Sequence, residues 1–259
     1  MAADAAELRS HRVTRLTILD FGAFDVRPDA RGPILRRIGI PGFLLETDLG
    51  ARILFDTGMD PAYAADPLGC EARDGLSSFG TLVDFSAGQT AAGQLAVLGL
   101  TPPDITHVIL SHGHIDHVGS LTLFPHRPII LTLIERAEPR PIYFGQVRPL
   151  DWPDASYHRI QRETVLCHGL LLIPTPGHVP GHLSALITIG GQSVILAADA
   201  INRASEPGEG FPDAMDPATA ATSAARLLEL QRLHDATMIY GHDPDQWPTL
   251  PKAPRPLIR

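Results

Sequence analysis

V-I-L-S-H-G-H-I-D-H-V-G, residues 108–119, sets the architecture that we expect for the whole chain. Three histidines and one aspartate fall within six residues of it: His112, His114, Asp116 and His117. Imidazole nitrogens and carboxylate oxygens are ligands that suit zinc and neighbouring transition metals. Such side chains are costly to place behind a buried strand unless a metal uses them. The stretch therefore predicts a metal site.

The spacing of these ligands favours a loop after a strand rather than one face of a helix. Residues two apart on a helix do not point the same way. Residues 108–110 form a short apolar run, and the glycine between the first two histidines lets the chain turn sharply. The first two histidines can then converge on one ion, and Asp116 and His117 point to a second ion beside it.

Further potential ligands follow apolar runs elsewhere in the chain. His178 comes after L-L-L-I-P-T-P-G, Asp199 after S-V-I-L-A-A, and His242 after T-M-I-Y-G. Strand ends at one edge of a sheet are where a rigid scaffold can hold a site. An aspartate between two cations can bridge them. We therefore expect all these side chains to meet at one edge.

Patterning on both sides of the histidine stretch indicates a mixed α/β chain. In the N-terminal part it predicts a strand at Val13–Leu19, a hairpin of Phe43–Thr47 and Arg52–Phe55, and loops at Asp20–Pro41 and Met59–Ala87. Later it predicts helices at Gln89–Leu98 and Pro217–His234, one starting within Val118–Phe124, and an irregular segment at Glu135–Tyr157. The later strands are expected at Thr106–Leu110, Pro128–Leu133, Leu170–Ile173, Leu183–Ile189, Ser193–Ala197 and Thr237–Tyr240.

Composition narrows the class of protein. The 259 residues are at the upper end of one domain, so we expect a single domain over 1–259. The net charge of −8 and the absence of long basic runs argue against nucleic acid as the main partner. No apolar run is long enough for a membrane span, and the N-terminus does not read as a signal peptide. The two cysteines, Cys70 and Cys167, fit a reducing cytoplasm.

The chain resembles the metallo-β-lactamase fold hydrolases. The resemblance rests on H-G-H-I-D-H with His178, Asp199 and His242, and it runs from F-L-L-E-T-D-L-G-A-R-I-L-F-D-T-G-M to G-H-D-P-D-Q-W. Within that superfamily it looks most like the N-acyl-homoserine lactonases, which open the lactone of bacterial quorum-sensing signals. L-L-E-T, D-T-G-M, T-P-G-H-V-P-G-H and A-D-A carry this closer likeness.

This resemblance implies a four-layer αβ/βα sandwich with the site at one edge. It implies one metal held by His112, His114 and His178, and a second held by Asp116, His117 and His242. Asp199 would bridge the two, and Asp56 would hydrogen-bond a ligand histidine. The ions would be two divalent metals, with zinc expected and manganese, iron or cobalt also accepted by such ligands.

The resemblance also implies a mechanism. A metal-bridging hydroxide would attack the lactone carbonyl, and Asp116 would carry a proton to the leaving alkoxide. Other hydrolases of the same fold stay open as alternatives, acting on another lactone, a phosphotriester or a thioester. A metal-binding protein without turnover is the non-enzymatic alternative. The sequence leaves the oligomeric state open, a homodimer included.

One position departs from the pattern of the lactonases. They usually carry a tyrosine three residues after the bridging aspartate, where this chain has Asn202. Asn202 could take its place, Tyr143 or Tyr157 could reach in, or the substrate could differ. His182 is expected to support the site rather than bind metal. An apolar groove for an acyl chain is expected from aromatic residues of the surrounding loops: Phe21, Phe24, Phe79, Phe85, Tyr143 and Phe144.

Overall fold

The computed structural model describes residues 7–26 and 36–259. Its α-helices are α1 (Pro67–Asp74), α2 (Ala91–Val97), α3 (Ile115–Val118), α4 (Leu133–Ala137), α5 (Glu206–Glu209) and α6 (Pro217–His234). Its strands are β1 (Val13–Val26), β2 (Arg36–Thr47), β3 (Arg52–Phe55), β4 (Gly80–Val83), β5 (His107–Ile109), β6 (Ile129–Thr132), β7 (Tyr157–Ile160), β8 (Thr164–Cys167), β9 (Leu170–Pro174), β10 (Leu183–Ile189), β11 (Gln192–Ala198) and β12 (Thr237–Tyr240).

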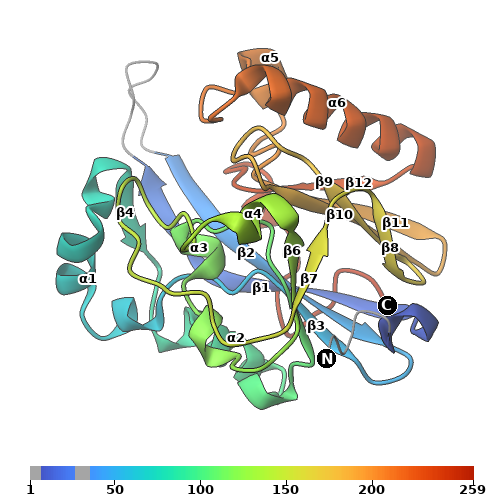
Figure 1. Ribbon diagram of the computed structural model, residues 1–259, viewed down its shortest axis with the longest axis horizontal. Coiled ribbons are helices and arrows are strands. Elements are labelled where there is room, and N and C mark those ends of the chain that lie inside the picture. The colour runs from blue at the N-terminus through green and yellow to red at the C-terminus, as the bar shows by residue number, and fades with distance from the viewer. Residues whose placement is uncertain (1–6, 27–35) are drawn as a thin grey trace.

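Two β-sheets lie at the centre, and helices cover their outer faces (Figure 1). Within the described residues one sheet has seven strands in the order β4-β1-β2-β3-β5-β6-β7, and the other has five in the order β12-β11-β10-β9-β8. Helices α1, α2 and α3 pack against the first sheet, and α6 packs against the second. This confirms the predicted four-layer αβ/βα sandwich.

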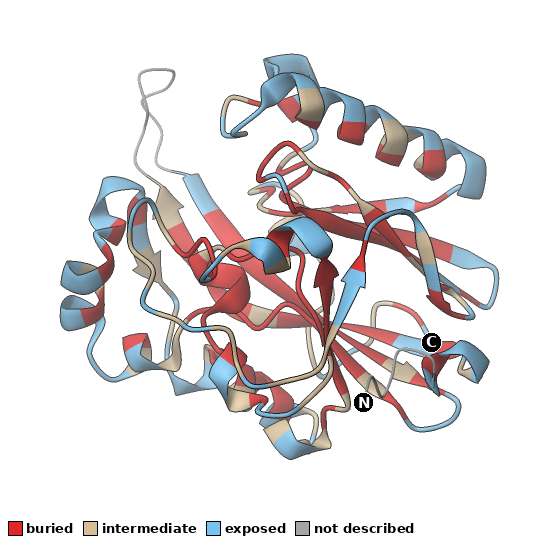
Figure 2. Cartoon of the chain, viewed as in Figure 1, coloured by how far each residue is buried: buried red, intermediate tan, exposed pale blue. Residues whose placement is uncertain are grey.

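Alternating side chains explain why the layers stack in this way. In β2, Phe43 and Leu45 point into the core between the sheets, whereas Leu44 points to the helix layer. In β11, Leu196 belongs to the core between the sheets and Ile195 to the core under α6. The central strands are buried on both faces, as Figure 2 shows. Sheets covered on both faces need near-continuous apolar strands, which is the pattern of the sequence.

Strand direction brings the polar residues to one edge. Strands β3, β5 and β6 are parallel neighbours, and β11 runs parallel to β12. Carboxyl ends of parallel strands share an edge, so the residues that follow these strands lie close together. Asp56 follows β3, His112 comes after β5, Asp199 follows β11 and His242 comes after β12.

The loop predicted at Asp20–Pro41 is wrong for its described part, and residues 27–35 lie outside the described chain. Strand β1 continues to its end at residue 26, and β2 begins at residue 36. The glycines here are needed in strands because aromatic rings lie over them. A Cβ on Gly39 would lie 2.2 Å from the Trp247 ring, and one on Gly42 would lie 2.0 Å from Phe21. A bulge in β1 shifts the register between the two strands.

Two further segments are more regular than predicted. Helix α3 begins at Ile115, before the predicted Val118–Phe124, so Asp116 and His117 lie on a helical turn rather than in an open loop. The backbone N–H of Ile115 donates to the carbonyl of Tyr143, which fixes where this turn starts. The loop predicted at residues 59–87 contains α1 and β4.

Helix α6 has the predicted bounds. Asp216 caps its first turn by accepting hydrogen bonds from the backbone N–H groups of Ala218 and Thr219, and Pro217 occupies the first position. Asp235 ends the helix in the left-handed conformation at φ 47°. No helix in residues 7–26 and 36–259 has the length and apolar character needed to cross a membrane.

Candidate metal centre

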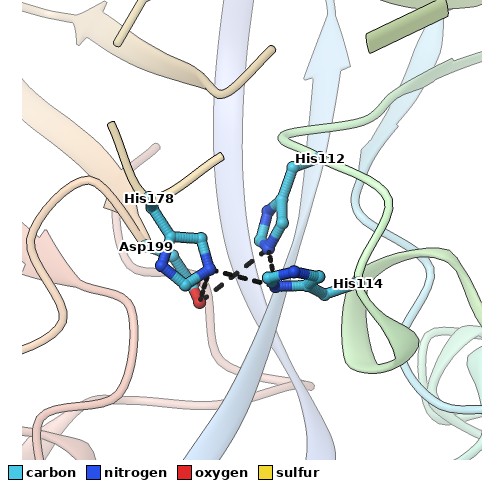
Figure 3. A group of neighbouring side chains, drawn as sticks. All are labelled: His112, His114, His178 and Asp199. Atoms are coloured by element: carbon cyan, nitrogen blue, oxygen red, sulfur yellow. Dashed lines mark hydrogen bonds and ion pairs between the residues drawn. The ribbon is translucent and has the colours of Figure 1, made fainter. Parts of the chain in front are cut away.

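A first group of ligand atoms converges at the sheet edge. His112 and His114 from the loop after β5, His178 from the loop after β9 and Asp199 directly after β11 point toward one another (Figure 3). His114 Nδ1 lies 2.9 Å from His112 Nε2 and 3.0 Å from His178 Nε2. Asp199 Oδ2 lies 3.3 Å from His178 Nε2 and 3.9 Å from His112 Nε2. The four side chains thus surround one position.

A second group lies beside the first. His242 Nε2 is 3.4 Å from Asp116 Oδ2 and 3.4 Å from Asp199 Oδ1. His117 Nε2 is 3.3 Å from Asp199 Oδ1 and 3.7 Å from Asp116 Oδ1. Asp199 therefore turns one carboxylate oxygen to each group, which is the arrangement that a bridging ligand requires.

The spacing and chemistry of both groups fit divalent cations. Ligand atoms of a tetrahedral zinc ion lie about 3.3 Å apart, given metal–ligand bonds of about 2.0–2.2 Å. Within each group that could hold an ion, the ligand atoms all lie within 4.8 Å of one another. Two of the atoms, His117 Nε2 and Asp199 Oδ1, are buried and have no hydrogen-bond partner among the described residues. Buried polar atoms without a partner are rare, and a bound cation would satisfy both.

Asp56 orients one of the histidines. Its side chain is buried, and its Oδ2 accepts a hydrogen bond from His117 Nδ1 at 2.8 Å. The same carboxylate accepts the backbone N–H and the hydroxyl of Ser111, both at 2.7 Å. With the proton on Nδ1, the Nε2 of His117 is free to bind a metal.

His242 and His182 are also oriented by hydrogen bonds. His242 Nδ1 donates to the carbonyl of Gly39 at 2.8 Å, which leaves its Nε2 for the second group. His182 Nε2 accepts the backbone N–H of Asp199 at 3.1 Å, and its Nδ1 lies 2.8 Å from the Thr175 hydroxyl. His182 thus uses both nitrogens to support the site, as the sequence suggests.

Burial and charge set the protonation of the histidines. Burial lowers the pKa of His112 and His178 well below the usual value and that of His114 to about 4. These rings are therefore neutral, the form that binds metals. Burial is the largest single influence on His242 and opposes its charged form, but the Asp199 and Asp116 carboxylates together outweigh it and raise the pKa to about 9. The second group thus attracts positive charge.

A pocket of about 920 Å³ opens over both groups. His114, Asp116, His178, Asp199 and His242 line its base. One wall is apolar and includes Phe24, Ile38, Leu76, Phe79, Ile115 and Phe144. The Phe79 ring lies 5.5 Å from that of Phe24 and 6.4 Å from that of Phe144, in edge-to-face contacts. The polar part of the lining, called the polar wall below, includes Arg36, Asn202, Arg203, Glu209 and Asp213.

The structure places some of the residues predicted to contact substrate in the pocket and others in the core. Phe24 and Asn202 line the pocket. The expectation for Tyr143 is wrong: it is fully buried, it is not among the described residues that line the pocket, and its hydroxyl lies 3.3 Å from Asp74 Oδ2. Phe21 is likewise buried in the core, and Tyr157 donates its hydroxyl hydrogen to a backbone carbonyl at 2.6 Å.

Sequence reasoning missed several supporting groups. Ser111 and the carbonyl of Gly39 each hydrogen-bond a histidine of the two groups, and Glu206 accepts a hydrogen bond from the backbone N–H of Asn202. For Ser111 the signal was its place beside the histidine stretch. The Gly39 contact joins segments 203 residues apart, so no local pattern marks it. Glu206 lies only four residues after Asn202, in a segment where the sequence predicts no helix or strand.

Comparisons with known proteins agree with this geometry. The Metallo-beta-lactamase superfamily matches residues 39–242. The N-acyl homoserine lactonase AttM of Rhizobium radiobacter is 30% identical over 243 residues, covering 84% of this chain and 86% of that protein. The N-acyl homoserine lactonase AiiA of Bacillus thuringiensis subsp. kurstaki is 33% identical over 218 residues, covering 79% and 81%.

A solved structure extends the likeness to the fold. An N-acyl homoserine lactone hydrolase with the product N-hexanoyl-L-homoserine at its catalytic metal centre superimposes with a TM-score of 0.81 and 26% identity. The match covers 95% of this chain and 99% of that one. The resemblance inferred from the sequence is therefore confirmed, and the chain belongs to the metallo-beta-lactamase superfamily.

Proposed function

We propose that this protein is a metal-dependent hydrolase that opens the lactone ring of N-acyl homoserine lactones, and so quenches quorum sensing. The observation that carries the proposal is Asp199, which turns one oxygen to each of two ligand groups at the base of the pocket. The similar lactonases support the choice of substrate. The apolar wall of the pocket suits an acyl chain.

We assign the ligands by the two groups. His112, His114 and His178 would hold one ion, Asp116, His117 and His242 would hold the other, and Asp199 would contribute to both. Zinc suits these nitrogen and oxygen ligands, and manganese, iron and cobalt are accepted by the same set. When bound, the two cations supply an activated water and a Lewis acid for the lactone carbonyl.

The chain's own side chains complete the reaction. Asp116 lines the pocket, and its Oδ2 lies within 3.4 Å of His242 Nε2, so it stands where a proton can pass to the leaving alkoxide. Phe24, Phe79 and Phe144 hold the acyl chain and exclude water. Asn202 belongs to the polar wall, where its carboxamide can hydrogen-bond the polar end of the substrate.

A single domain and a cytoplasmic location also belong to the proposal. The site draws on residues from Asp56 to His242, so both sheets must be present to build it. Both cysteines, Cys70 and Cys167, are buried free thiols, which fits a reducing compartment. A homodimer is compatible with this architecture.

Substrate profiling tests the proposed function. The purified, zinc-loaded protein is assayed against N-acyl homoserine lactones, simple lactones, phosphotriesters and thioesters side by side. The proposal expects ring opening of the acyl homoserine lactones with the highest kcat/KM of the panel, and loss of that activity in Asp199→Ala. A higher kcat/KM for a phosphotriester or a thioester would replace it with another hydrolase of this fold. No turnover of any of them would support a non-enzymatic metal-binding protein.

A further inference from the structure

The segment that leaves β11 connects the bridging ligand to the polar wall of the pocket. It contains Asp199 and then Asn202, the position at which the resembled lactonases carry a tyrosine. Asn202 is 7% exposed and lines the pocket. Its buried polar groups therefore need partners inside the protein, and Glu206 supplies one for the backbone N–H and one for Nδ2.

Glu206 is a buried carboxylate with an exposed fraction of only 2%. Its Oε2 accepts a hydrogen bond from the backbone N–H of Asn202, and its Oε1 lies 3.4 Å from Asn202 Nδ2. Arg203 Nη1 lies 3.9 Å from Oε1. Burial raises the pKa of Glu206, and the hydrogen bond from Asn202 opposes that effect. Burying a carboxylate costs free energy, so a buried carboxylate at this position is expected to have a structural or functional role.

Asn202 also hydrogen-bonds a predicted metal ligand, His242. Its backbone carbonyl accepts the N–H of His242 at 2.9 Å. Two further hydrogen bonds join the same segments: Gly241 N–H donates to the carbonyl of Ile201 at 3.1 Å, and Ala204 N–H donates to Asp243 Oδ2 at 2.9 Å. The segment after β11 and the segment after β12 are thus tied together next to His242.

The other end of His242 is held by the first half of the chain, through the carbonyl of Gly39. The ring is therefore fixed by its own Nδ1 on one side and by its backbone on the other. If the backbone contact through Asn202 shifts, Nε2 moves relative to Asp116 and Asp199, both 3.4 Å away. The first group, at His112, His114 and His178, has no member in this segment other than the bridging aspartate.

We propose that Glu206 is a positioning residue: through Asn202 it holds His242 at the second metal group and sets the polar wall of the pocket. This inference rests on the two-metal site of the proposed function. It assigns to Glu206 a stronger effect on the second ion, because the hydrogen bonds that it supports lead to His242, whereas the first group has only the bridging Asp199 in this segment.

The test compares Glu206→Gln with Glu229→Gln, both measured as the full chain. Glu229 is an exposed carboxylate of α6 in an ion pair with Arg226 at 2.7 Å, so it controls for loss of one charge. Zinc affinities of both sites are measured by competition with a chromophoric chelator. Absorption of the cobalt-loaded protein reports the geometry of the sites. We expect Glu206→Gln to lower the zinc affinity of the second site about tenfold to a hundredfold and to leave the affinity of the first site within about twofold of the wild type.

Either of two results overturns the inference: wild-type affinity for both ions in Glu206→Gln, or equal loss of both. If Glu206→Gln does not fold, Glu206→Asp keeps the charge and answers the same question by the same measurement. Glu206→Asp should lower the zinc affinity of the second site alone, by less than tenfold. Wild-type protein that binds two ions but opens no lactone would refute the proposed function and leave this inference standing.

Discussion

Replacing Asp56 by asparagine removes the carboxylate that orients His117 while keeping its size. The backbone of Asp56 is in the left-handed region at φ 62°, a conformation that asparagine also tolerates, so the exchange adds no backbone strain. Asparagine can still accept the Ser111 N–H at Oδ1. At Oδ2 it places an amide N–H against His117 Nδ1, which lies 2.8 Å away. His117 then loses the acceptor that keeps its proton on Nδ1.

The size of the effect follows from these contacts. The lost hydrogen bond to a buried charge is worth about 1.5–3 kcal/mol, but burial raises the pKa of Asp56, so the neutral amide avoids part of the cost of burying a charge. We therefore expect the metal-free protein to lose about 1.5 kcal/mol of stability. Loss of a partner of this kind lowers metal affinity about 10–100-fold, or about 1.4–2.8 kcal/mol. Urea unfolding in chelator measures the first quantity, and zinc competition with a chromophoric chelator measures the second.

Asp84→Asn is the matched control for Asp56→Asn. Asp84 also has a positive φ, 51°, but it is exposed and pairs with Arg37 at 2.9 Å on the surface. It should change stability by less than about 1 kcal/mol and leave zinc affinity as in the wild type. If Asp56→Asn binds zinc as tightly as this control, the hydrogen bond to His117 does not orient a ligand, and the reasoning fails.

Asp199→Ala should leave about one metal ion per chain and remove most activity, and two ions by elemental analysis would contradict its bridging role. Phe79→Ala should raise KM for a decanoyl lactone about eightfold, because about 50 Å² of lost apolar contact is worth about 1.2 kcal/mol. An equal rise for a butanoyl lactone would contradict the proposal that the apolar wall binds the acyl chain. Burial raises the pKa of Glu135 from its ordinary value of 4.5 to about 7, so its ionisation removes stability as the pH rises from about 4.5 to about 7. In the metal-free protein, the free energy of unfolding of Glu135→Gln minus that of the wild type should therefore grow by about 3 kcal/mol across that range, as measured by urea unfolding. A difference that stays constant with pH would contradict a buried, ionising Glu135. Glu138→Gln is the control.

Local patterns were enough to predict much of the fold. Helix α6 and strands β10 and β12 have the predicted bounds, because apolar periodicity and capping residues mark them within the sequence itself. The histidine stretch also predicted the grouping at the sheet edge, since strand ends that follow apolar runs meet there. These features depend on neighbours in sequence, which is the information that a single chain provides.

Contacts between distant segments could not be predicted. The glycines before residue 42 look like loop residues until Trp247 is seen to lie over Gly39. Tyr143 looks like a substrate contact until Asp74, which lies 69 residues away, is seen to bond its hydroxyl inside the core. In both places a side chain from elsewhere decides the environment. Glu206 was missed for a different reason: it lies only four residues after Asn202, but the contact depends on how the irregular segment after β11 turns.

The most direct test of the central claim is a zinc titration of the metal-free protein, with opening of N-hexanoyl homoserine lactone followed at each step. If two cations share Asp199 between the two groups, activity should rise to a plateau at two zinc ions per chain. A plateau at one ion per chain, or no ring opening with two ions bound, would contradict the account.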